Sequence, residues 1–374
     1  MSFIFILLIF VIFTITSKST PINDFAPINI ELMKYSRSSN INFTEHPKLS
    51  ALPRQNIQLD NNENLDSMYI GKIQINKQVF KMFFDTESSE LWVPSPECKT
   101  KICNSLKKIT GPFKDLKKQT TVTYGSGDVK MKFATVDINI AGFTAKDQTF
   151  GRAIKVFDNN RNLPFDGILG LGPESLSFEK RPTLVSTLVK QGLLKNPQFS
   201  FYLTDSNDKP SLFTIGGVDK TKFKGKIHFS PVIDKVGRWF IELGGVSING
   251  KKTSTVGADG AVIQTSSSRI SVPAANAKSF YKMIPKATEI SDGVYAIPCD
   301  SKVKVSVKLS GQTWDINPKD FVLQSIPNRP NFCLGAIHGK QKLRYWIFGS
   351  VFMKNVYTVY QIGKNQSIGF AKLV

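Results

Sequence analysis

Residues 85–94, DTESSELWVP, decide the fold of this 374-residue chain. They follow an apolar run, VFKMFF at residues 79–84, of the kind that forms a buried strand. A second stretch, AVIQTSSS at residues 261–268, again places Thr-x-Ser after a short apolar run. Asp85 opens the first loop, whereas Gln264 stands at the corresponding point of the second. The sequence therefore indicates two related loops, one with a carboxylic acid and the other with an amide at the corresponding position.

Each loop is followed at the same distance by an element of two hydrophobic residues and a glycine. Gly170 comes 85 positions after Asp85, and Gly349 comes 85 positions after Gln264. A repeat of this length predicts two similar lobes with a cleft between them. Short β-type runs recur from Met68 to the end, and the clearest helix is expected at residues 182–189.

The order of these motifs resembles that of the pepsin-like (family A1) aspartic proteases over about residues 59–374. Further matches are DGILGLG at 166–172, QGL at 191–193, FSFYL at 199–203, IGGVD at 215–219 and WIFGSVF at 346–352. Residues 123–127, TYGSG, resemble the flap hairpin that closes over bound peptide in this family, and place Tyr124, Gly125 and Gly127 in it. The resemblance implies an all-β, bilobal acid protease fold with a central cleft and a flap hairpin.

The resemblance also suggests domain boundaries. An N-terminal lobe is expected at residues 59–225 and a C-terminal lobe at 226–374. Residues 18–58 are proline-rich and polar, and match the place of a pro-segment that covers the cleft; the alternative is a loosely ordered arm. The apolar run near the N-terminus predicts a signal peptide over 1–17, with an uncleaved anchor as the alternative, and no later segment is expected to span a membrane.

The catalytic chemistry of the family is damaged in this chain. Hydrolysis needs two carboxylates close enough to share one proton. By the resemblance Asp85 is the retained first aspartate, and Gln264 occupies the position of the lost second one. Glu87 and Ser266 stand where the family has glycine, close to the reacting water. The sequence predicts a disrupted dyad, although Glu87 offers a second carboxylate near Asp85 as an alternative.

The residues that support the loops are retained. In the family, threonines at the positions of Thr86 and Thr265 join the two loops, and Ser88 and Ser267 match the supporting hydroxyls. The cleft is therefore expected either to bind an extended peptide by strand-like hydrogen bonds or to persist only as a structural framework.

Four cysteines, an even number, suit a chain that enters an oxidising compartment. Short-range spacing and the resemblance together imply the disulfides Cys98–Cys103 and Cys299–Cys333. A metal site is the competing interpretation, but there is no Cys-x-x-Cys pair and the three histidines are scattered, so neither a metal nor a cofactor is expected. Asn42 and Asn365 begin glycosylation motifs.

The formal net charge of +20 is high, and lysines crowd residues 99–118. An anionic partner is one interpretation of this run, and a solvated loop without a specific ligand is the favoured one. No module for nucleic-acid binding is recognisable.

Three functional hypotheses follow: a pseudoprotease that keeps fold and cleft, an active but atypical aspartic endopeptidase, and an interaction or inhibitor protein that uses the basic surface. The protein is expected to be a secreted monomer, with the endo-lysosomal lumen as the alternative location.

Overall fold

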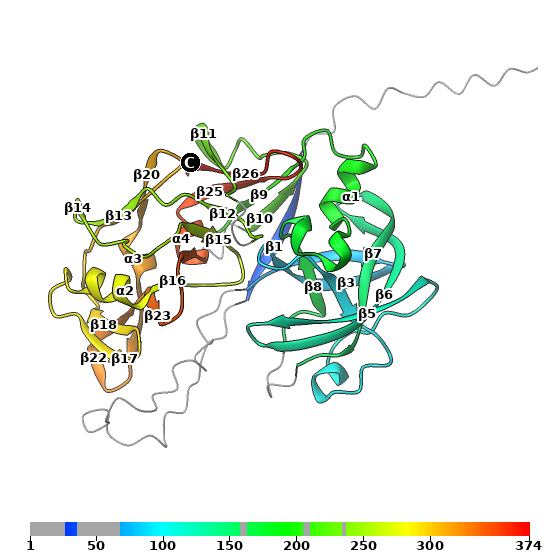
Figure 1. Cartoon of the computed structure of the whole chain (residues 1–374), viewed down its shortest axis with the longest axis horizontal. Coiled ribbons are helices and arrows are strands. Elements are labelled where there is room, and N and C mark those ends of the chain that lie inside the picture. The colour runs from blue at the N-terminus through cyan, green and yellow to red at the C-terminus, as the bar shows by residue number, and fades with distance from the viewer. Residues whose placement is uncertain (1–26, 36–67, 158–162, 205–209, 234–236) are drawn as a thin grey trace, which may run out of the picture.

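The computed structural model describes residues 27–35, 68–157, 163–204, 210–233 and 237–374. Within these ranges the chain forms two strand-rich lobes that lie side by side (Figure 1), as the sequence predicted. The signal peptide, most of the 18–58 extension and the motif at Asn42 lie outside them. No helix in these ranges is long and apolar enough to cross a bilayer.

A 13-stranded sheet passes from one lobe to the other. Its strand order is β11-β26-β25-β9-β10-β1-β2-β3-β8-β4-β7-β6-β5. Its strands are β1 (Ile28–Tyr35), β2 (Met68–Ile75), β3 (Gln78–Asp85), β4 (Leu91–Pro94), β5 (Lys114–Tyr124), β6 (Gly127–Ile140), β7 (Phe143–Lys155), β8 (Gly167–Gly170), β9 (Gln198–Tyr202), β10 (Ser211–Ile215), β11 (Phe223–Pro231), β25 (Val356–Gln361) and β26 (Ser367–Leu373). The first lobe is built on β2 to β8.

Three smaller sheets build the second lobe, with orders β12-β15-β24-β16-β23, β14-β13-β19-β20 and β17-β18-β22-β21. Their strands are β12 (Phe240–Ile241), β13 (Gly245–Ile248), β14 (Lys251–Lys252), β15 (Ala261–Ile263), β16 (Ile270–Pro273), β17 (Thr288–Ser291), β18 (Val294–Pro298), β19 (Val305–Leu309), β20 (Gln312–Ile316), β21 (Val322–Ile326), β22 (Arg329–Gly335), β23 (Ile337–Lys340) and β24 (Trp346–Phe348).

The described helices are short. They are α1 (Leu184–Lys190), α2 (Ala274–Tyr281), α3 (Pro318–Phe321) and α4 (Ser350–Met353), with 3₁₀ turns η3 (Lys101–Asn104), η4 (Glu174–Leu176) and η5 (Phe178–Lys180). The predicted helix at 182–189 corresponds to α1, but it begins two residues later. The reason is a capping bond, because the Thr183 hydroxyl accepts from the Ser186 amide at 3.4 Å.

The 85-residue repeat is confirmed by the strand pairing. In the first lobe β3 runs parallel to β8, and β4 pairs antiparallel with β8 and parallel with β7. In the second lobe β15, β24, β16 and β23 repeat these pairings. A Cβ on Gly170 would lie 2.3 Å from the Ser89 carbonyl carbon, and one on Gly349 would lie 2.0 Å from the Ser267 oxygen. Glycine recurs in both repeats because each loop passes directly against this residue.

Aromatic side chains close the junction between the lobes. The ring of Phe199 stacks on that of Tyr360 with centroids 4.9 Å apart, and Trp239 meets Tyr360 edge to face at 5.0 Å. All three are buried, and the Trp239 indole donates to the Leu171 carbonyl at 2.9 Å. Packing of this kind is worth about 0.5–1.5 kcal/mol per pair beyond area burial.

Part of the 18–58 extension is a strand of the central sheet. β1 lies between β10 and β2 and pairs antiparallel with both (Figure 1). Leu32 is buried in the core, and Asn29 donates to the Asp219 carboxylate at 2.6 Å. Residues 28–35 are therefore ordered by the same sheet that joins the lobes.

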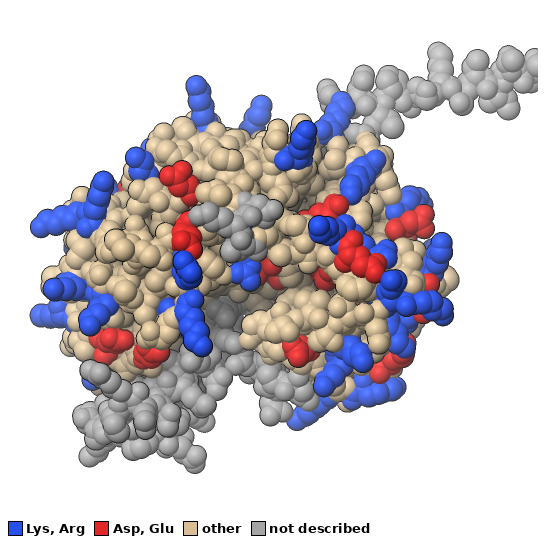
Figure 2. Space-filling view, viewed as in Figure 1, with Lys and Arg blue, Asp and Glu red and all other residues tan. Residues whose placement is uncertain are grey.

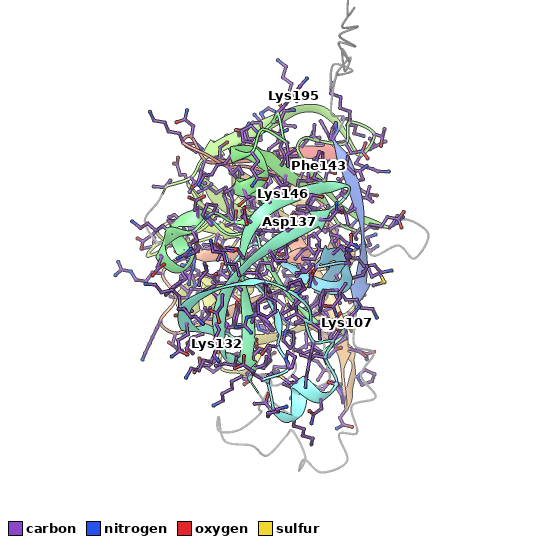
Figure 3. The ribbon with its side chains drawn as sticks, turned by 90° about the vertical axis from the view of Figure 1, so that its right-hand side faces the viewer. Lys107, Lys132, Asp137, Phe143, Lys146 and Lys195 are labelled. Atoms are coloured by element: carbon purple, nitrogen blue, oxygen red, sulfur yellow. A yellow bond between two sulfur atoms is a disulfide. The ribbon has the colours of Figure 1, made fainter. Side chains whose placement is uncertain are left out.

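Both predicted disulfides are present: Cys98–Cys103 ties the loop after β4 to η3, and Cys299–Cys333 ties the loop after β18 to β22. The basic run lies at the surface, as expected, with Lys108 half-buried and its other lysines exposed. Figure 3 faces the outer side of the first lobe, where Lys107 and Lys132 lie toward opposite edges. Charged side chains are spread over both lobes on the face shown in Figure 2.

Removing the Cys299–Cys333 bridge with two serines should destabilise the protein more than removing Cys98–Cys103. The sequence separations are 34 and 5 residues. In the chain-entropy picture these loops correspond to about 4 and about 2 kcal/mol, because closing a longer loop restricts the unfolded chain more. Denaturant unfolding of the two double-serine variants checks the order, and an equal loss in both would contradict it.

Replacing Lys99, Lys101, Lys114 and Lys118 with glutamine should leave the melting temperature within about 2 °C of the natural protein. These side chains are exposed, and surface substitutions are usually worth less than about 0.5 kcal/mol. Thermal unfolding followed by circular dichroism makes the comparison. A large drop would show that the run has a structural role.

Candidate active site

Asp85 ends β3 and is 3% exposed. One carboxylate oxygen accepts from the Glu87 amide at 2.8 Å, and the other accepts from the Ser88 hydroxyl at 2.6 Å. Burial raises the pKa of Asp85, while the bonds from Ser88, Glu87 and Ser266 act in the opposite direction. The predicted role of Ser88 in orienting this carboxylate agrees with the geometry.

Reciprocal hydrogen bonds join the two loops. The Thr86 amide donates to the Thr265 hydroxyl at 3.1 Å, and the Thr265 amide donates to the Thr86 hydroxyl at 3.0 Å. The Thr265 hydroxyl also donates to the Phe84 carbonyl at 2.6 Å. Tyr360 contacts the second loop, because its hydroxyl donates to the Ile263 carbonyl at 3.2 Å. Both loops are thus held in fixed register at the junction of the lobes.

Gln264 follows β15 and is 8% exposed. Its amide nitrogen in the main chain donates to the Phe348 carbonyl at 3.1 Å. Within the described part of the chain, its side-chain oxygen is buried without a hydrogen-bond partner. The second loop therefore brings a neutral amide to the junction, and the Ser266 hydroxyl of the same loop reaches Asp85.

Ser267 acts within its own loop. Its hydroxyl donates to the Arg269 carbonyl at 3.2 Å and accepts from the Arg269 amide at 3.3 Å. These bonds stabilise the turn after Gln264.

Glu87 reaches across to the second lobe. One carboxylate oxygen lies 3.0 Å from the Nε atom of Arg238, which directly precedes Trp239 and β12. The other oxygen is buried and has no partner among the described residues. Burial raises the pKa of Glu87 to about 7; Arg238 lowers it and the nearby Asp85 raises it. The Arg238 guanidinium also donates to the Tyr345 hydroxyl, just before β24. This interlobe pair was not predicted from the sequence.

The flap is a hairpin of β5 and β6, with Gly125 and Ser126 between the paired residues Tyr124 and Gly127. The Tyr124 hydroxyl accepts from the Trp92 indole at 2.9 Å. Burial, together with the charge of Asp85, raises the pKa of Tyr124.

Gly127 has φ +127°, and a Cβ there would lie 2.7 Å from the Phe157 Cβ. Glycine is therefore required at this point of the flap. The side chain of Tyr124, the aromatic residue of the flap, lies close enough to Asp85 for the charge of Asp85 to act on its pKa.

Sequence reasoning also missed Glu90. It is buried, and its carboxylate accepts from the Phe178 amide at 2.5 Å. Its pKa is raised by burial, against the effects of that bond and of Arg181. Nothing in the single sequence distinguishes Glu90, Arg238 or Tyr345 from surface residues, because their partners lie far away along the chain.

The structure thus brings Asp85, Thr86, Ser88, Tyr124, Gln264 and Thr265 to one junction, with Ser267 bonded within the second loop. Asp85 brings a carboxylate to this junction and Gln264 brings an amide. The amide offers hydrogen bonds but no proton exchange near working pH.

Comparison with known proteins agrees with the fold. The family described as "Eukaryotic aspartyl protease" matches residues 68–373. A probable aspartic-type endopeptidase CTSD of Arthroderma benhamiae is 32% identical over 83% of this chain, which spans only 62% of that protein's length. An aspartic protease of Phaffia rhodozyma is 31% identical over 83% of this chain and 77% of its own. Chymosin of Camelus dromedarius is 29% identical over 83% and 82%. The chain therefore belongs to the pepsin-like family of eukaryotic aspartyl proteases.

Proposed function

We propose that this chain is a pepsin-like pseudoprotease whose cleft binds an extended peptide without hydrolysing it. The observation that carries the proposal is that the first loop places the carboxylate of Asp85, and the second loop the amide of Gln264, at a junction where Thr86 and Thr265 join the two loops.

The chemistry supports the loss of turnover. One carboxylate must take a proton from water while the other, protonated, donates to the carbonyl. Gln264 neither carries charge nor exchanges a proton in this range. Each lost proton transfer typically costs about 10²–10⁴-fold in rate.

Peptide binding is supported by the parts that remain. The Tyr124 flap is bonded to Trp92, and the loops are held in register. Extended peptides bind such grooves through main-chain hydrogen bonds, which do not depend on the second aspartate.

An atypical active endopeptidase is the second candidate. Glu87 favours it, since the pKa of this carboxyl is raised to about 7 and it lies near Asp85. Against it, Glu87 extends from the same loop as Asp85 and is paired with Arg238. A shared-proton pair needs two carboxyls that face each other, so the pseudoprotease remains the better interpretation.

The third hypothesis, an interaction protein with an anionic partner, rests on the exposed lysines and the net charge alone. Capture of such a partner would weaken steeply with salt, whereas binding in the cleft would depend on the flap. The proposal includes secretion as a monomer, with the endo-lysosomal lumen as the alternative location.

The natural protein should show no pepstatin-sensitive cleavage of unfolded protein between about pH 3 and 6, where carboxylate pairs titrate. Gln264→Asp alone should recover little, because the Glu87 carboxyl still interacts electrostatically with Asp85. The triple variant Gln264→Asp, Glu87→Gly, Ser266→Gly should recover measurable cleavage, since the supporting hydroxyls are in place.

Adding Asp85→Asn to the triple variant is the matched control and should abolish the recovered activity. Peptide-library cleavage followed by mass spectrometry measures all forms. Robust activity in the natural chain that disappears in Glu87→Gln would overturn the pseudoprotease and assign the second carboxylate to Glu87.

A further inference from the structure

Within the part of the chain that the structure describes, the Glu87–Arg238 pair is a charged contact that joins the two lobes beside Asp85. It extends from the first loop to the segment before β12, 3.0 Å from carboxylate oxygen to Nε. The Glu87 and Arg238 side chains are 27% and 36% exposed. The pair is thus partly desolvated, and both side chains remain partly accessible to solvent.

Arg238 is held in position by a second contact. Its guanidinium donates to the Tyr345 hydroxyl and lies over the Tyr345 ring, 6.0 Å from the centroid. A guanidinium presents several donors in a rigid fork that matches a carboxylate. When the Glu87 carboxylate is protonated, Tyr345 still holds Arg238, and the guanidinium offers its donors to another anion.

The environment of Glu87 favours protonation of its carboxylate in acid. Asp85, in the same loop, repels its charge, and burial disfavours it further; Arg238, from the second lobe, is the opposing cation. The pKa of Glu87 is raised from 4.5 to about 7, so the carboxyl is ionised and paired above pH 7 and neutral below it. A guanidinium group keeps its charge throughout this range.

We propose that Arg238 sets the peptide specificity of the cleft by binding an acidic side chain of the peptide. Glu87 competes with this side chain for Arg238 and releases Arg238 in acid. This rests on the proposed peptide-binding function and names its ligand class. A peptide aspartate has an ordinary pKa near 4, so between about pH 4.5 and 6.5 the ligand is charged while Glu87 is neutral.

The expected change of peptide affinity with pH follows from the fraction of the protein in which Glu87 is neutral. With a pKa of about 7, that fraction falls about tenfold between pH 6 and pH 8. Affinity for an acidic peptide should therefore fall about tenfold over the same interval. A neutral peptide, which does not compete for Arg238, should show little change.

The test uses two matched sets of fluorescein-labelled octapeptides of Ser, Val, Leu and Phe. One set carries a single Asp at each of the central positions in turn, and the other carries Asn there. Fluorescence polarisation at fixed ionic strength gives dissociation constants for the full chain at pH 6 and pH 8. The best Asp peptide should bind the natural protein about tenfold more tightly than its Asn partner at pH 6, as for a charge-assisted hydrogen bond.

Variants distinguish the contributions of Glu87 and Arg238 to binding of the Asp peptide. Glu87→Gln should bind the Asp peptide equally at both pH values, and Arg238→Gln should lose the Asp preference. Because Arg238→Gln leaves Glu87 without its cation, the double variant Glu87→Gln, Arg238→Gln repeats the measurement in a neutral pair. Glu97→Gln is the control, since Glu97 pairs with Lys132 and Arg152 and not across the lobes. It should retain both the preference and its pH dependence.

A readout without peptide tests the pair directly. Carbon-13 NMR of labelled glutamate, with the Glu87 signal assigned from Glu87→Gln, should show a midpoint near pH 7 that rises in Arg238→Gln. A midpoint near that of an exposed glutamate would overturn the proposal. Equal binding of Asp and Asn peptides would also overturn it while leaving peptide binding intact. Failure of every peptide with every variant would instead reject the proposed function itself, and this inference with it.

Discussion

The rest of the structure depends on the reciprocal bonds between Thr86 and Thr265. Each threonine offers a main-chain donor to the hydroxyl of the other, so neither loop can shift without leaving buried polar groups unpaired. An unpaired buried group costs about 1–3 kcal/mol, which makes this contact a strong constraint on the register of the two lobes. These bonds involve no side-chain atom of Asp85 or Gln264. A glutamine at position 264 is therefore compatible with this framework.

The sequence predicted the framework well because the framework is repetitive. Gly170 and Gly349 recur at one spacing since each packs against the backbone of its own loop, and such steric requirements are visible in a single chain. The disulfides were predictable from the cysteine spacing together with the family resemblance, and the exposed lysines from the hydration of charge.

The electrostatics of the site could not be predicted in the same way. Glu87 was expected to lie close to the reacting water, but its partner Arg238 lies about 150 residues further along the chain, on the other lobe. Burial, which sets the pKa of Glu87, appears only when both lobes are in place. A single sequence reveals which residues could titrate but not which will be desolvated together.

β1 has a topological consequence for the central sheet. It is a single strand that fills the gap between β10 and β2, so it satisfies two sheet edges at once. A cut in the chain after Tyr35 would free β1 from its covalent link to β2 while both ladders still held it in place. Loss of the strand would instead expose the main-chain donors and acceptors of two neighbours, and open edges of that kind recruit strands from other molecules. Residues 28–35 thus help to prevent association with other copies of the protein through open sheet edges.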